Sequence, residues 1–244
     1  MKIKEIWVHA SSQDAKQGYK GLKYLIYESL ATILTKILLY TPITANQLTI
    51  MGSIFVYVAA VLFGFGETWY YIVAIIFLYL GELMDASDGT LARCKKACTR
   101  IQSNFIGNVY HSSAYPLLFL GIGYGVFLNT GDGLHLLFGA LAAFSQESIG
   151  FLLFLRNTVL LKEGLSVTDD YISDIKISFL NKLLRFPMKW LRIIIIVTLI
   201  FGRFDIFLIF YGIFISLKAI GFFYSSYFSL RKIEREINAK KSSK

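Results

Sequence analysis

The sequence has few cysteines, no apolar leader and no strand-like alternation, and each of these absences excludes a class of protein. Its two cysteines, Cys94 and Cys98, have no other cysteine or histidine nearby. A structural zinc site needs further ligands of this kind, so the pair predicts reduced thiols. Residues 1–17 contain no apolar run that could serve as a signal peptide. The regular alternation of polar and apolar residues that builds a membrane β-barrel is also absent.

What the sequence does contain is long apolar segments. Its residues are 55% hydrophobic, which is more than soluble domains of this size usually carry. Several segments approach or exceed the roughly 18 residues that a helix needs to cross a bilayer core. Because backbone in lipid must be hydrogen-bonded internally, we expect an all-α integral membrane protein. The predicted spans are residues 44–65, 69–84, 105–128, 134–155, 191–201 and 206–230.

Three regions are predicted along the chain. Residues 1–40 place apolar positions at spacings of three and four among lysines, which is typical of an amphipathic helix lying in the membrane interface. Residues 41–230 form a six-span transmembrane domain, and residues 231–244 form a basic cytoplasmic tail. A second interfacial helix is expected at residues 175–187. The chain shows no internal repeat.

The distribution of positive charge predicts the orientation of the chain. The net charge is +9, but only Arg203 among the 25 lysines and arginines falls in a loop on the side opposite to the termini. Lysines and arginines accumulate in cytoplasmic loops, so both termini are expected in the cytoplasm of a multi-pass protein of the cell membrane. The charge therefore reflects topology and anionic lipid, and no nucleic-acid partner is expected.

Two carboxylates stand where the second predicted span ends, in the run DASDGTLAR. Asp85 and Asp88 are spaced so that they share one face of a helix. Carboxylates at this depth are costly unless they bind something, usually a cation. Gly89 permits a backbone turn or the close approach of a ligand, Ala92 keeps the next turn narrow, and Arg93 offers a fork of donors suited to phosphate. The run predicts a divalent cation on a diphosphate.

This run resembles the CDP-alcohol phosphotransferase family, whose pattern is D-x2-D-G-x2-A-R followed, after about eight or nine residues, by G-x3-D-x3-D. The first half of the pattern matches at every fixed position. Upstream, residues 41–49 resemble the family's first span, which often starts with P-N-x-x-T. The resemblance therefore implies that Asn46 and Thr49 contribute to nucleotide binding. The six-span layout and the amphipathic N-terminal helix are similar as well.

The second half of the family pattern is not present. Counting nine residues after Arg93 puts Ser103 at the family's glycine, Gly107 at its third aspartate and His111 at its fourth. In the family, the first three aspartates are implied to be metal ligands and the fourth a general base for the acceptor hydroxyl. No aspartate or glutamate occurs between Asp88 and Asp132, so both of the later carboxylates are missing.

The residues that replace them recur every fourth position. Ser103, Gly107 and His111 therefore lie near one face of the third predicted helix, with Asn104 and Asn108 beside it. His111 stands where the resemblance implies the base, and an unperturbed histidine has a pKa of about 6.5, suited to accepting a proton near neutral pH. It is a candidate base or ligand, the alternative being a structural hydrogen-bonding role. Asn108 is a candidate neutral metal ligand.

The loss of two carboxylates favours one divalent cation, Mg²⁺ or Mn²⁺, over two, because bridging carboxylates offset the repulsion between two ions. Glu82, one turn before the motif, is a candidate replacement carboxylate; the alternatives are a cap or a contact with the lipid interface. Glu147 and Lys218 lie mid-span and would be expensive facing lipid, so they either pair across the bundle or shape an acceptor pocket. The predicted substrate pocket consists of Glu82, Ser103, Asn104, Glu147 and Lys218.

The leading interpretation is a membrane transferase. It would move a phosphate-linked alcohol from a CDP-activated donor to an acceptor hydroxyl and release CMP, with one of the two substrates lipid-linked. The resemblance implies a place in phospholipid biosynthesis and a homodimer. The altered second half of the motif favours a divergent branch that decorates a cell-surface glycan or an unusual lipid. Two alternatives stay open: a metal-dependent enzyme with a different nucleotide donor, and a non-catalytic relative that binds nucleotide or lipid.

Overall fold

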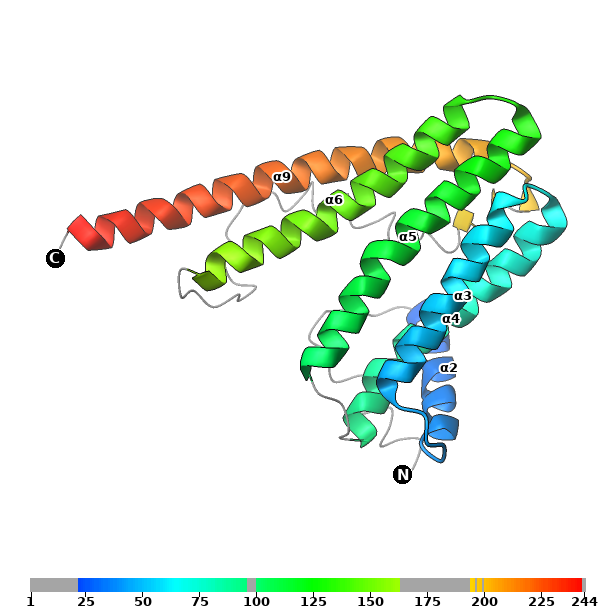
Figure 1. The fold of residues 1–244 in the computed structure, drawn as a ribbon, viewed down its shortest axis with the longest axis horizontal. Helices are drawn as coiled ribbons and strands as arrows, with labels where there is room; N and C mark the ends of the chain where they lie inside the picture. Colours follow the sequence, from blue (N-terminus) through cyan, green and yellow to red (C-terminus); the bar gives the residue numbers. More distant parts are fainter. Residues whose placement is uncertain (1–21, 96–99, 163–193, 196, 199, 243–244) are drawn as a thin grey trace. The chain divides into compact units, whose positions relative to one another are not determined.

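The computed structural model describes residues 22–95, 100–162, 194–195, 197–198 and 200–242, and within these it contains helices and no strand (Figure 1). The side chains of residues 22–28, 100–104, 111 and 236–242 lie outside the description. The helices are α2 (Leu22–Leu38), α3 (Ala45–Gly64), α4 (Thr68–Lys95), α5 (Arg100–Thr130), α6 (Leu134–Lys162) and α9 (Phe204–Ser242).

Four helices in the described part of the chain are long and apolar enough to cross a membrane: α3, α4, α6 and the part of α9 that ends at Arg235. They coincide with four of the six predicted spans. The third predicted span forms α5, a helix that contains Pro116 and is not among the four. Residues 191–193, 196 and 199 of the fifth predicted span, 191–201, and all of the interfacial helix expected at 175–187 lie outside the described residues. The prediction of an all-α membrane protein is confirmed; the number of spans and the side of the termini stay predictions.

A capping box starts α3. The Thr44 hydroxyl accepts a hydrogen bond from the backbone N–H of Gln47 at 3.3 Å, and the side-chain oxygen of Gln47 accepts one from the backbone N–H of Thr44 at 2.9 Å. The two side chains thus satisfy N–H groups that the first turn of a helix leaves without intrahelical partners. This reciprocal pair fixes the first turn of α3, which includes Asn46.

Helices α3 and α4 form an antiparallel hairpin that is closed where two glycines meet (Figure 1). A Cβ atom on Gly52 would lie 2.9 Å from the carbonyl oxygen of Gly81, and one on Gly81 would lie 2.7 Å from the carbonyl oxygen of Gly52. No larger residue fits at either position without moving backbone. Further along, Phe55 and Phe77 pack edge to face with ring centroids 5.5 Å apart.

Helix α2 packs against α4 through small polar side chains. The Ser87 hydroxyl lies 3.3 Å from the Ala31 carbonyl oxygen, and the Thr35 hydroxyl lies 3.5 Å from the Ser87 carbonyl oxygen. A buried cluster joins α2, α3 and α4; its members are Leu38, Leu48 and Leu91. The amphipathic helix predicted within residues 1–40 is therefore present from Leu22 to Leu38 with one face buried, while its place in the membrane interface stays a prediction.

The chain divides into two compact units inside α5, between Gly121 and Ile122. The second unit contains α6 and α9, which lie side by side and run in the same direction (Figure 1). The Arg203 guanidinium, in the exposed turn before α9, donates two hydrogen bonds of 3.1 Å to Asp205. Because α9 continues to Ser242, the predicted basic tail is helical as far as that residue.

The glycine contact gives a stability prediction. Gly81→Leu should force α3 and α4 apart and lower the free energy of unfolding by about 1–3 kcal/mol, because an overpacked helix contact displaces backbone. Denaturant unfolding of the purified protein in micelles measures this. Gly150→Leu on α6 is the matched control, since a Cβ there meets no atom within 4 Å. Equal stability of the two variants would contradict the packing described for the hairpin.

Candidate nucleotide and metal site

Asp85 and Asp88 lie one turn apart on α4, and both are half-buried. The hydroxyl of Thr49 on α3 donates a hydrogen bond to Oδ2 of Asp88 and also lies 3.1 Å from the Ala45 carbonyl oxygen. A hydroxyl has one proton, so Thr49 serves one of these acceptors at a time. The structure thus brings together two of the predicted site residues, Thr49 and Asp88, which lie 39 positions apart in the sequence.

Gly89 lies inside α4, which continues without a break to Lys95. It makes no backbone turn, so of the two roles predicted for it only the close approach of a ligand stays open. A Cβ on Gly89 would lie 3.4 Å from Nη1 of Arg93, whose Nη2 donates a 3.1 Å hydrogen bond to the Thr90 hydroxyl. Gly89 therefore leaves room for the guanidinium to fold back along the helix. Ala92 is half-buried in the same last turns of α4, while Arg93 is exposed.

The altered second half of the motif lies on α5. Ser103, Gly107 and His111 fall in one regular helix, so their common helical face is confirmed for the backbone. The side chains of Ser103, Asn104 and His111 lie outside the described ones. Asn108 is exposed, and a Cβ on Gly107 would meet no atom within 4 Å. The roles predicted for these residues stay predictions.

A hydrogen bond between α4 and α5 sets the register of the two motif halves. The hydroxyl of Tyr115 on α5 donates to Oε1 of Glu82 on α4 at 3.3 Å. Asp85 follows Glu82 by about one turn, and His111 precedes Tyr115 by about one turn. The two helices run in opposite directions (Figure 1). A step toward the C-terminus of α4 and a step toward the N-terminus of α5 therefore lead in the same direction along the pair. The register thus brings residue 111 to about the level of Asp85.

Glu82 itself is buried, with 4% of its surface exposed, inside the length of α4. Both alternatives considered for it, a cap and a contact with the lipid interface, are therefore wrong. Its bond to Tyr115 shows that it joins two helices close to the motif. A second such link joins the hydroxyls of Tyr57 on α3 and Ser113 on α5 at 2.7 Å. The sequence analysis missed both links, because tyrosines in apolar helices give no sign of their partners.

Among the described side chains, no three His, Cys, Asp or Glu residues gather closely enough to enclose a metal ion. Mg²⁺ is commonly bound by one or two carboxylates together with substrate phosphates and water, and Mn²⁺ prefers the same oxygen ligands. The donor set of Asp85 and Asp88 fits a cation of this kind that is shared with a diphosphate. This pair of carboxylates supplies fewer negative charges than a metal site formed by protein ligands alone.

Two other predicted pocket residues lie in the second unit. Glu147 is exposed on α6, and Lys218 is half-buried on α9. Two residues before each of them, the hydroxyls of Ser145 and Ser216 are 2.9 Å apart. Since α6 and α9 run in the same direction, Glu147 and Lys218 lie at similar levels along the pair (Figure 1). Whether they pair or contact substrate stays a prediction.

The sequence analysis also missed Lys95. Its ammonium group donates hydrogen bonds of 2.7 Å to the carbonyl oxygens of both Thr41 and Ile43, in the turn between α2 and α3. A lysine in the last turn of a helix is expected to interact with the helix dipole. That expectation does not indicate a contact with a turn more than 50 positions earlier in the chain.

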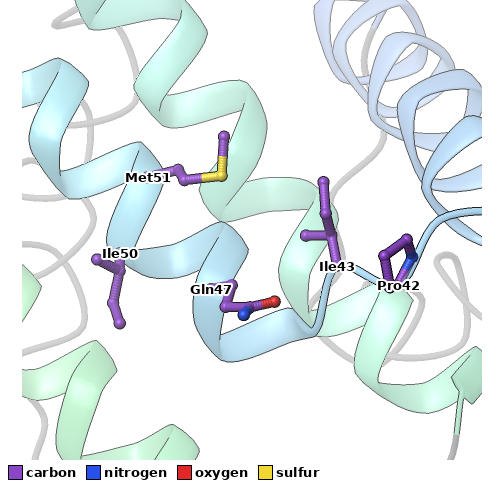
Figure 2. A pocket seen from close by; sticks show the side chains of 5 residues that line it. All are labelled: Pro42, Ile43, Gln47, Ile50 and Met51. Atoms are coloured by element: carbon purple, nitrogen blue, oxygen red, sulfur yellow. The ribbon is translucent and has the colours of Figure 1, made fainter.

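A cavity of about 440 Å³ opens beside this turn and the first turns of α3 (Figure 2). It is lined by four apolar side chains and one amide, those of Pro42, Ile43, Ile50, Met51 and Gln47. The three α3 residues lie on a different face of the helix from the one that carries Thr49. The cavity therefore adjoins the site residues without including them.

This architecture defines a class of protein. It is a membrane protein of long helices, one of which carries an acidic pair and an arginine at its end. Residues 42–105 match the family model for CDP-alcohol phosphatidyltransferase, so the predicted family is confirmed over this stretch. The match includes Asn46, Thr49 and the complete first half of the motif, and it ends before His111. The family indicates membrane transfer of phosphate-linked groups from CDP-alcohols. No curated protein matches the chain with significant similarity.

The contact between Thr49 and Asp88 gives a prediction about the site. Thr49→Val should weaken Mn²⁺ binding in the presence of CDP by about tenfold, because a hydrogen bond to a charged group is lost at nearly constant shape. Paramagnetic resonance of free Mn²⁺ measures the affinity. Thr158→Val is the control, since that hydroxyl donates to the carbonyl of Phe154 on its own helix. Unchanged affinity in Thr49→Val would show that the contact does not serve the site.

Proposed function

We propose that the protein transfers a phosphate-linked alcohol from a CDP-activated donor to an acceptor hydroxyl and releases CMP. One observation carries this proposal. The half-buried pair of Asp85 and Asp88 lies at one end of a membrane-spanning helix, within the stretch that matches the family. Thr49 is hydrogen-bonded to Asp88, and Arg93 follows the pair. Carboxylates are retained at such a position when they bind a charged ligand.

Each residue of the first half has a role in the proposed reaction. A divalent cation, Mg²⁺ or Mn²⁺ and one rather than two, would be held by Asp85 and Asp88 and would neutralise charge on the donor diphosphate. Asn108 is the candidate for a further, neutral ligand. Arg93 binds phosphate through its guanidinium fork. The small residues Gly89 and Ala92 leave room for the nucleotide, and Asn46 and Thr49 contact it from α3.

His111 accepts the proton of the acceptor hydroxyl in the proposed reaction. The acceptor oxygen forms a new bond to the donor phosphorus, and the bond from that phosphorus to the bridging oxygen of CMP breaks, so CMP leaves with the electron pair. The register of α4 and α5 supports this role, because residue 111 lies at about the level of Asp85. Positioning and charge neutralisation supply most of the catalysis in reactions of this kind.

The surroundings of the site follow from the charge distribution. The positive-inside rule supports a site that faces the cytoplasm, where nucleotides are available. Because the motif lies at the end of a membrane-spanning helix, one of the two substrates is lipid-linked. The residues of the first unit proposed to shape the acceptor pocket are Glu82, Ser103 and Asn104. The family resemblance supports a homodimer.

A second candidate is a relative that binds a nucleotide or lipid without transfer. It is favoured by the missing pair of carboxylates and by the absence of a three-ligand cluster among the described side chains. The retained Asp85 and Asp88 argue against it, since charged groups without a ligand are costly at this depth.

Release of CMP tests the transferase proposal. Purified protein is given a panel of CDP-alcohols with lipid extract and Mg²⁺ or Mn²⁺. Asp85→Asn and Asp88→Asn should each lower the rate at least about 100-fold, because they remove charge stabilisation of the transferred phosphate. Glu67→Gln, in the exposed turn before α4, is the control for loss of a carboxylate. Absence of CMP from every donor, together with absence of nucleotide binding, would reject the proposal.

A separate prediction concerns the base. His111→Ala should lower kcat about 10²–10⁴-fold with a smaller change in KM, because general base catalysis contributes about this much. The dependence of kcat on pH near neutrality should disappear with the imidazole. Undiminished activity in His111→Ala would remove the base assignment and leave the transferase proposal standing.

A further inference from the structure

We infer that Lys95 is a positioning residue that holds the turn before α3 in the shape needed for nucleotide binding. The inference rests on the proposed function for the choice of ligand, since the residues that the turn positions are those proposed to contact the nucleotide. Lys95 lies within the stretch that matches the family model, two residues after Arg93, the last fixed position of the matched half of the motif.

Lys95 binds two carbonyl groups of the turn at the same time. The half-buried Nζ of Lys95 donates to the carbonyl oxygens of Thr41 and Ile43, each at 2.7 Å. An ammonium group has three donors and no acceptor, and its hydrogen bonds to neutral acceptors are strengthened by its charge. Two carbonyls on either side of Pro42 converge on one cation only while the turn keeps this conformation. Lys95 therefore selects that conformation of the turn.

Other hydrogen bonds of the turn connect it to α2 and α3. The Thr41 N–H and hydroxyl donate to the Leu38 carbonyl at 3.1 and 2.9 Å, which ties the start of the turn to α2. The capping box of Thr44 ties its end to α3. Lys95 supplies a polar link from the turn to α4, the helix that carries the acidic pair.

Two polar links, in addition to the buried cluster that joins α2, α3 and α4, connect the start of α3 to the end of α4. Thr49 contacts Asp88 within the helices, and Lys95 contacts the turn beyond them. Asn46 lies between these links, in the first turn of α3. Without Lys95 the turn can move while the Thr49 contact stays in place, so the first residues of α3 lose their fixed position relative to Asp88 and Arg93.

This arrangement predicts an effect on nucleotide affinity. Lys95→Met removes the charge and all donors at similar length, and should raise the Kd for CDP in the presence of Mn²⁺, and the KM for the donor, about tenfold through loss of a charged hydrogen bond. The kcat should change by less than about threefold, because Lys95 touches the turn and not the reacting atoms. Lys95→Arg should restore the affinity, since it keeps a cationic donor.

The experiment uses the full-length purified protein. Lys162→Met, an exposed lysine at the end of α6, controls for loss of a positive charge. If Lys95→Met does not fold, Lys95→Gln replaces it. Hydrogen exchange of the 39–47 backbone, a second readout that needs no ligand, should be faster in the neutral variant than in the native protein, with the Gly52–Gly81 region of the hairpin unchanged.

The outcomes separate this inference from the proposed function. Unchanged CDP affinity and unchanged exchange in the neutral variant would overturn the role of Lys95. An equal loss of affinity in Lys95→Arg, or in Lys162→Met, would overturn it as well. If the native protein binds CDP but releases no CMP, the transferase proposal fails while the affinity comparison still decides the role of Lys95; if it does not bind CDP, exchange decides it.

Discussion

The contact between Gly52 and Gly81 is the constraint on which the first unit depends. Because neither residue has a Cβ, the backbones of α3 and α4 meet. A Cβ added to either glycine would lie within 3 Å of the carbonyl oxygen of the other. This spacing lets Thr49 reach Asp88 across the hairpin. At a wider spacing, the Thr49 hydroxyl would not meet the Asp88 carboxylate.

The site is built outward from this hairpin. Its acidic pair occupies the last turns of α4, the bond between Glu82 and Tyr115 sets the level of α5, and Lys95 fastens the turn before α3. A transferase that works mainly by positioning and charge neutralisation needs this kind of rigid support. The two carboxylates that this chain lacks relative to the family pattern would have stood on α5.

The sequence predicted the helices and the motif, because hydrophobic length and residue spacing are local properties. Its polar run at 85–93 was placed correctly at the end of a long apolar helix. Contacts that depend on tertiary packing were beyond it: the partners of Lys95 and Tyr115 lie more than 30 positions away. Gly89 shows the same limit, since a glycine that permits a turn lies in a continuous helix when packing favours one.

The most direct test of the account is a crystal structure of the protein with CDP and Mn²⁺, in which anomalous scattering locates the metal. The account predicts a single Mn²⁺ bound by Asp85 and Asp88 and by the diphosphate of CDP. Two fully occupied metal sites would contradict the single-cation proposal. A nucleotide bound away from the acidic pair, with no Mn²⁺ at Asp85 and Asp88, would contradict the proposed function itself.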